Sequence, residues 1–188
     1  EVNILKARND IEDSIKEASA TETEVDILTT IDENQANGIA RISREIMADM
    51  IILDWPQKEG EINSFIAGTV NEVLYETDKT VYLGKMNKPL GLHKRIVMAV
   101  PALAELEKGF ELWFMKIAKL SQELSVPIVM YCNQSTEAAV TQLAKQQKLS
   151  ITVNAQDFTE WEDFLILAKY IDEDDLIILV SARQGSVS

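Results

Sequence analysis

The sequence is poor in the residue types that most often build catalytic and metal sites. It contains one cysteine, Cys132, and one histidine, His93, in 188 residues. One cysteine cannot form an internal disulfide, and this pair cannot supply the ligands of a structural zinc site. His93 lies in the Pro/Gly-containing segment KPLGLHK and is expected to be a solvated loop residue. We therefore expect neither Ser-His-Asp nor Cys-His catalysis, and predict that the protein is not an enzyme.

Long hydrophobic runs are also missing. No stretch approaches the ~18 consecutive apolar residues of a membrane-spanning helix, and the first residues lack the basic-then-apolar order of a signal peptide. The sequence starts at Glu1 without a methionine and stops shortly after an apolar run. These observations predict a soluble piece of a longer protein.

Positive charge is scarce relative to negative charge. The chain has 18 Lys and Arg against 31 Asp and Glu, which gives a formal net charge of −13. Such a field repels nucleic-acid backbones and anionic lipid surfaces. We therefore expect no nucleic-acid partner and no direct lipid binding.

Short apolar runs of strand length alternate with longer segments of helical period. This alternation is typical of an α/β, doubly wound, mostly parallel sheet with helices on both faces. Core-facing helical stripes are expected at Ile39, Ile42 and Ile46, and over 110–120, while residues 3–19 should form a surface helix. The buried thiol of Cys132 should end a strand. The expected strands are 25–30, 50–55, 80–84, 95–100, 127–132, 150–154 and 175–181.

A polar segment divides the chain into two units. Residues 85–94 belong to the stretch GKMNKPLGLHK, which combines glycine, proline, asparagine and three lysines, and we interpret them as a linker between 1–84 and 95–188. The segments ADMIILDWPQKEG and EDDLIILVSARQG echo each other across this linker. The echo favours an internal duplication.

Ligands of a parallel sheet bind beyond the carboxyl ends of its strands, and this rule sorts the candidate sites. The acidic cluster DEDD, 172–175, precedes its strand, so we expect a solvated turn and no metal. Thr159 and Glu162 have the spacing of a capping box at a helix start. The remaining candidates are phosphate-binding loops, and they contain Asp54, Gly68, Thr69, Ser181, Gly185 and Ser186.

The first of these loops carries a family resemblance. A strand, a loop of about a dozen residues, Gly68-Thr69 and then VNEVLYETDKTVYLG resemble the end of a universal stress protein domain, which has an adenine nucleotide alpha hydrolase-like fold. Nucleotide-binding members read G-x-x-G, nine residues, then G-(S/T). Gly68 and Thr69 match the final pair, and Trp55 and Lys58 stand at the two earlier glycines. We interpret the loop as the remnant of a nucleotide site and expect no cofactor, with ATP as the ligand that the resemblance leaves open.

A more specific resemblance covers essentially the whole chain. The segments GIARISREIMADMIILDWP, KRIVMAVP and WEDFLILAKYIDEDDLIILVSARQGSVS look like the cytoplasmic C-terminal region of bacterial sodium or potassium:proton antiporters, in which two universal-stress-like units follow the membrane domain. By this resemblance 1–84 and 95–188 are two partial units, which complement each other within one sheet or across a dimer.

The antiporter resemblance also implies a function. It implies a regulatory or assembly domain without catalytic activity, held at the cytoplasmic face of the inner membrane as part of an integral membrane protein. Its expected partners are the membrane domain of the same transporter and a second copy in a homodimer. The alternative is a stand-alone universal stress protein that binds a nucleotide.

Overall fold

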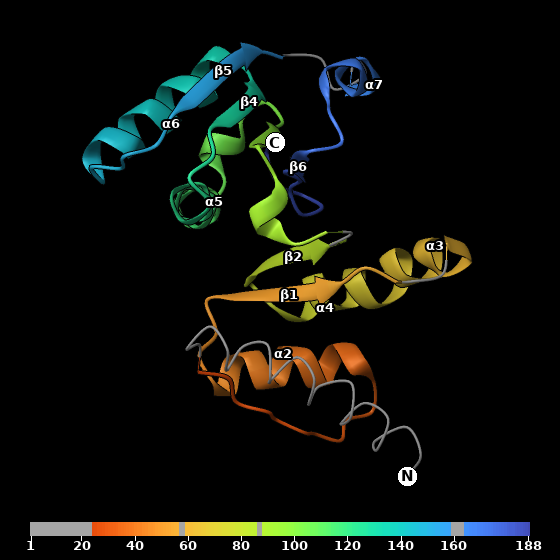
Figure 1. The fold of residues 1–188 in the computed structure, drawn as a ribbon. Coiled ribbons are helices and arrows are strands. Elements are labelled where there is room, and N and C mark those ends of the chain that lie inside the picture. The colour runs from red at the N-terminus through yellow and green to blue at the C-terminus, as the bar shows by residue number, and fades with distance from the viewer. Residues whose placement is uncertain (1–23, 57–58, 86–87, 159–163) are drawn as a thin grey trace.

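The chain is α/β, with parallel strands in two sheets. The computed structural model describes residues 24–56, 59–85, 88–158 and 164–188. Within these ranges every strand runs parallel to its neighbours, as Figure 1 shows. The expected fold class is therefore confirmed. The expected helix over 3–19 and the capping box at Thr159 and Glu162 lie outside the described residues.

Six described strands build the two sheets, and one sheet lies before the segment 85–94 in the chain while the other lies after it. A two-stranded sheet has the order β1-β2, and a four-stranded sheet has the order β5-β4-β3-β6. Five of the seven predicted strands are confirmed to within two residues at each end. The bounds are Met50–Asp54 for β1, Thr80–Gly84 for β2, Arg95–Ala99 for β3, Ile128–Cys132 for β4, Val153–Asp157 for β5 and Asp175–Leu179 for β6.

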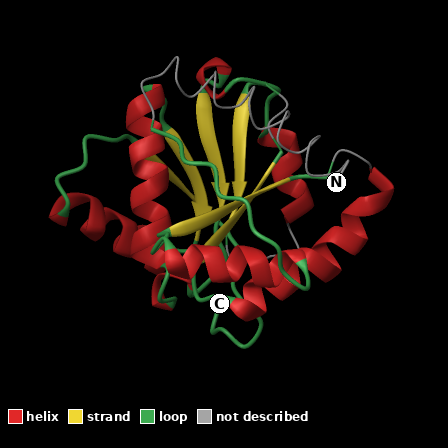
Figure 2. Ribbon diagram, turned by 90° about the horizontal axis from the view of Figure 1, so that it is seen from below, coloured by secondary structure: helices red, strands yellow, loops and turns green. Residues whose placement is uncertain are grey.

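Helices lie on both sides of the strands, as Figure 2 shows. In the four-stranded sheet, α5 and α6 cover one face, and α7 packs on the other through Leu167. Residues 59–76 form one continuous helical stretch, in which a π-helical turn at Ile66–Val70 joins α3 to α4. The helix bounds are Gln35–Glu45 for α2, Ile62–Phe65 for α3, Asn71–Glu76 for α4, Phe110–Leu124 for α5, Gln134–Gln146 for α6 and Phe164–Leu167 for α7.

The main core lies between the four-stranded sheet and helices α5 and α6. Side chains that alternate along β3 and β4 point to this face, and the apolar stripe of α5 packs on them as predicted. Within the stripe, the rings of Phe110 and Trp113 meet edge to face at 5.4 Å. Cys132 belongs to the same cluster and is 2% exposed, which confirms the buried thiol at the end of a strand. The core members are Ile96, Met98, Val100, Ala104, Phe110, Trp113, Phe114, Ile117, Ile128, Met130, Cys132, Val140 and Leu143.

Helix α2 faces its core with small residues and with Ile39, so the stripe expected there is confirmed only in part. Ile46 is 55% exposed, whereas Ala36 and Ala40 are fully enclosed. The opposite side of α2 is also in contact, because a Cβ on Gly38 would lie 3.4 Å from Asp32. Ile39 is half-buried and packs against the same core, so the expected stripe is confirmed at Ile39 and wrong at Ile46.

Two strand predictions differ from the structure. Residues 25–30 do not form a strand: Val25 and Leu28 stay half exposed, and the segment is tied to α2 where Arg41 binds Asp32. The strand expected at 150–154 is instead Val153–Asp157. This strand ends the sheet, so polar residues that face solvent replace the apolar run that the prediction required.

The linker contains a short 3-10 turn at Leu90–Leu92, and His93 follows it. His93 is half-buried, and its Nδ1 is enclosed without a hydrogen-bond partner among the described residues. The expectation of a fully solvated histidine is therefore wrong.

Candidate functional site

The topology of the four-stranded sheet locates the position at which such folds bind ligands. The chain runs from β3 outward to β4 and β5, then returns across the sheet to β6 on the other side of β3. Ligands of open α/β sheets bind beyond the carboxyl ends of the strands at this change of direction. The segments that leave the sheet there are 101–109 and 181–188. We call them together the carboxyl-edge site.

A glutamate of the first segment is held by the second. Glu107 Oε1 accepts hydrogen bonds from the backbone N–H of Val187 at 3.0 Å and of Ser188 at 2.9 Å, and from Ser188 Oγ at 2.9 Å. The Ser188 backbone bond is the largest influence that holds the pKa of Glu107 below its usual range. These three donors, which could receive an anionic ligand at this edge, are therefore bound to the chain's own carboxylate.

The first turn of α6 lies at the same edge of the sheet. Donors of this turn also form hydrogen bonds within the chain. Asn133 caps the helix by accepting from the Thr136 N–H at 2.9 Å. The Thr136 hydroxyl is fully enclosed and donates to Glu105 Oε2 at 2.7 Å. A carboxylate near a helix N-terminus is favoured by the helix dipole, so Glu105 takes the role that an anion would have. Sequence reasoning missed both glutamates; the Asn133 cap was readable from its spacing to Thr136, whereas Glu105 gives no local signal.

Three predicted site residues lie in the segment after β6. Ser181 is exposed directly after the strand. The next residues form a turn in which the Ser186 N–H donates to the Arg183 carbonyl at 3.0 Å. Gly185 has φ +86°, a left-handed conformation that favours glycine. The glycine is thus explained by the turn.

The other three predicted site residues belong to the two-stranded sheet and its helix. Asp54 ends β1, is exposed, and accepts from the Trp55 N–H at 2.9 Å. Gly68 and Thr69 lie in the π-helical turn of Ile66–Val70, well inside the helical stretch 59–76. Amides inside a helix point along its axis to carbonyls of the preceding turn. The expected loop before Gly68 is therefore wrong for most of its length, because that part of the chain is helix.

An arginine of the carboxyl-edge site ties the second unit to the first. Arg183 donates to the carbonyls of Leu74, Thr77 and Lys79, with a distance of 2.6 Å to Thr77. These carbonyls lie at and just beyond the end of α4, where helices leave acceptors without intrahelical partners. A guanidinium at a helix C-terminus also interacts favourably with the helix dipole. The sequence does not reveal this role, since it joins residues more than a hundred positions apart.

The acidic cluster 172–175 lies at the amino end of β6, where basic side chains neutralise it. Asp174 pairs with Lys94 at 2.6 Å and with Lys88 at 3.0 Å. Asp175 is buried against Arg95. Among the residues that the structure describes, no group of three or more His, Cys, Asp or Glu side chains is placed to hold a metal ion.

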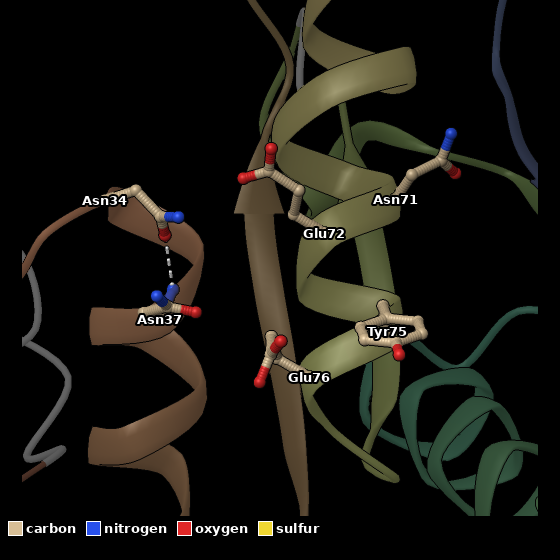
Figure 3. A pocket seen from close by; sticks show the side chains of 6 residues that line it. All are labelled: Asn34, Asn37, Asn71, Glu72, Tyr75 and Glu76. Carbon is tan, nitrogen blue, oxygen red and sulfur yellow. Dashed lines mark hydrogen bonds between the residues drawn. The ribbon is translucent and has the colours of Figure 1, made fainter.

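A shallow groove of about 250 Å³ lies between α2 and α4. Figure 3 shows Glu72 and Glu76 pointing from α4 toward α2, while Tyr75 lies on another side of the helix. Tyr75 is 88% exposed, and the Asn34 side chain is committed to the cap of α2 through the Asn37 N–H at 2.8 Å. The groove is therefore open to solvent.

No protein-family model, curated protein or solved structure matches this chain. Over the described ranges, no helix is both long enough and apolar enough to cross a membrane.

Proposed function

We propose that this chain is a regulatory or assembly domain of a monovalent cation:proton antiporter, without catalytic activity of its own. The observation that carries the proposal is the state of the carboxyl-edge site. Glu107 binds the Val187 and Ser188 amides, and Glu105 binds Thr136 at the first turn of α6. Donors that receive a substrate in an enzyme of this architecture are used here for internal contacts. The transporter assignment rests on the sequence resemblance, and it would place the domain on the cytoplasmic side.

The mechanism follows from the contacts between the two units. A tethered domain regulates a transporter when it contacts two transporter states with different free energies. Arg183 connects the segment after β6 to the end of α4, and Lys116 of α5 pairs with Asp49 before β1 at 3.4 Å. A change in the contact between the membrane domain and one unit would therefore also alter the position of the other unit.

The proposal is tested on the complete gene product in everted membrane vesicles. Cation-induced collapse of a proton gradient is measured for the full protein, for a deletion of this region and for an Arg183→Met variant. We expect cation:proton exchange to continue after the deletion. The proton or cation concentration that gives half-maximal exchange should shift several-fold, and Arg183→Met should shift this concentration in the same direction. Lys119→Met, an exposed lysine on α5, is the matched control. A gene product without membrane helices, or unaltered transport after the deletion, would overturn the proposal.

One observation favours the alternative of a nucleotide-binding stress protein. Three donors converge on Glu107 Oε1, and such a set can also bind phosphate if the carboxylate moves away. ATP at 100 times its Kd would raise the free energy of unfolding by about 2.7 kcal/mol, which is a shift of roughly 5–10 °C in Tm. Under the regulatory proposal we expect ATP to leave the Tm unchanged, both for the natural chain and for the Glu107→Gln variant.

A further inference from the structure

The two edges of the four-stranded sheet differ in their protection. At one edge, β5 reads VNAQD, and Asn154, Gln156 and Asp157 are exposed. Polar and charged residues on an edge strand discourage pairing with another chain. At the other edge, β6 reads DLIIL, and Ile177 and Leu179 are 47% and 53% exposed. The β6 edge has no proline and no lysine, and its one charge is at its first residue.

The main chain of β6 offers hydrogen-bonding groups at this edge. The Asp174 carbonyl accepts from Lys94 N–H at 2.9 Å, and the Val180 N–H donates to the Ala99 carbonyl at 3.0 Å, so these residues bond toward β3. Because backbone groups alternate in direction along a strand, Ile177 and Leu179 direct their N–H and C=O away from β3. Among the described strands none pairs with this edge, and an edge of this kind is a template for a further strand.

The side chains beside the edge form an apolar margin. In the sheet register Ile177 lies next to Val97 and Leu179 next to Ala99, and both neighbours are 3% exposed. α7 packs on this face over Ala99, and Ile166 and Tyr170 of α7 and the following turn are 47% and 59% exposed. At roughly 200 Å² for a large side chain, these four groups expose on the order of 400 Å². That is about half of what one partner buries in a standard interface of ~800 Å² a side.

We propose that β6 pairs antiparallel with β6 of a second copy of this chain, across a two-fold axis at Ile177. A two-fold axis makes an edge its own complement, because each residue then faces the partner residue equally far on the other side of the axis. Ile177 faces the partner's Ile177, and Leu179 faces the partner's Asp175. The outward N–H of Ile177 and of Leu179 both find carbonyl acceptors in this register.

Charge selects the antiparallel arrangement. Each copy carries a net charge of −13, and its acidic turn at 172–174 lies at one end of β6. Antiparallel pairing places the acidic turns at opposite ends of the interface, beside the uncharged residues 180–182 of the other copy. Parallel pairing would bring the two turns together, which costs free energy. The product is one continuous sheet of eight strands, and this inference does not depend on the transporter proposal.

Sedimentation velocity of the 188-residue chain over a hundredfold concentration range tests the pairing. We expect a reversible dimer for the natural sequence and a monomer for Ile177→Lys, with Kd weakened by at least about 100-fold. Asn154→Lys puts the same side chain on the exposed face of the opposite edge strand and should leave the dimer intact. Circular dichroism should be unchanged in both variants, since both positions are exposed.

A covalent trap tests the register without depending on the lysine variant. Cys132 is 2% exposed, so Ile177→Cys introduces the one accessible thiol among the described residues. Mild oxidation should give a disulfide-linked dimer of Ile177→Cys and leave Asn154→Cys monomeric. The proposal is overturned if the natural chain is monomeric throughout, if Ile177→Lys still dimerises, or if Asn154→Cys links as readily. Slow hydrogen exchange at Ile177 and Leu179 in a monomer would also overturn it, because the same chain would then cover the edge.

Discussion

Arg95 and Asp175 form a two-pronged ion pair between neighbouring strands. Arg95 Nε lies 2.6 Å from Asp175 Oδ1, and Nη2 lies 2.8 Å from Oδ2. The Asp175 side chain is 2% exposed and also accepts from the Asp172 N–H at 2.8 Å. Burial opposes ionisation of Asp175, but the bonds from Arg95 and Asp172 outweigh it and hold the pKa below its usual value. The pair thus aligns β6 on β3 at their amino ends.

Asp175→Ala should lower the free energy of unfolding by about 3 kcal/mol, because it removes the buried partner of a charged group. Asp172→Ala is the matched control. Its side chain is 81% exposed and meets Arg95 at 3.2 Å, so its loss should be below about 1 kcal/mol. Urea unfolding followed by circular dichroism measures both. Equal losses for the two variants would contradict the structural role given to Asp175.

Arg183→Met should free the end of α4. The variant loses three hydrogen bonds from one guanidinium to the carbonyls of Leu74, Thr77 and Lys79, and bonds to charged groups contribute about 1.5–3 kcal/mol. We expect a loss of about 2 kcal/mol and faster hydrogen exchange through Asn71–Glu76. Arg183→Lys should recover only part of the lost free energy of unfolding, since one ammonium cannot span the same acceptors. Unchanged exchange in α4 would show that the contact does not stabilise the helix.

The carboxyl group of Asp174 should titrate well below an ordinary aspartate. The hydrogen bond with Lys94 is the largest cause and the bond with Lys88 is the second largest, and together they lower the pKa of Asp174 from 3.8 to about 2. A lowered folded-state pKa stabilises the fold at pH values above the ordinary one, and this stabilisation is lost as the pH falls through about 2. Lys94→Ala should move the pKa back toward 3.8, as read from the carboxyl carbon by NMR. A titration near 3.8 in the natural chain would refute the pairing.

Cys132 should be unreactive while the protein is folded. Burial is the main cause that raises the pKa of its thiol, and nearby carboxylates add to it, which brings the pKa to about 11. A disulfide reagent at pH 8 should label the native chain at least about 100-fold more slowly than the chain unfolded in guanidinium, because both thiolate fraction and access are low. Rapid labelling of native protein would place the thiol at the surface.

The sequence predicted the strands well where apolar runs coincide with burial on both faces. β3 and β4 are central strands, and their predicted and observed bounds agree closely. The edge strands β1, β2 and β6 were also predicted, because they too are apolar, but two segments broke the rule in opposite directions. β5 is polar and was placed three residues early, whereas 25–30 has an apolar pattern and no partner strand. Whether a segment forms a strand depends on the presence of a partner strand, and the periodicity of the sequence does not reveal that partner.

The candidate site was harder to predict because its contacts are made between distant segments. Glu107 lies 80 positions from Val187, and Thr136 lies 31 from Glu105. Motif reasoning pointed instead to Gly68 and Thr69, whose spacing suits a loop that opens a helix. The helix already begins near Ile62, so the same residues occur in a different structural setting. Nucleotide binding by those residues stays a prediction.

Arg183 also has a consequence for the order of assembly. All six described strands precede it in the chain, so the contact between Arg183 and the end of α4 can form only after the strands of both sheets have been synthesised. This part of the contact between the two units is therefore added late. A chain shortened to end before residue 183 should keep both sheets and the Lys116–Asp49 pair, and it should lose only the anchor at the end of α4.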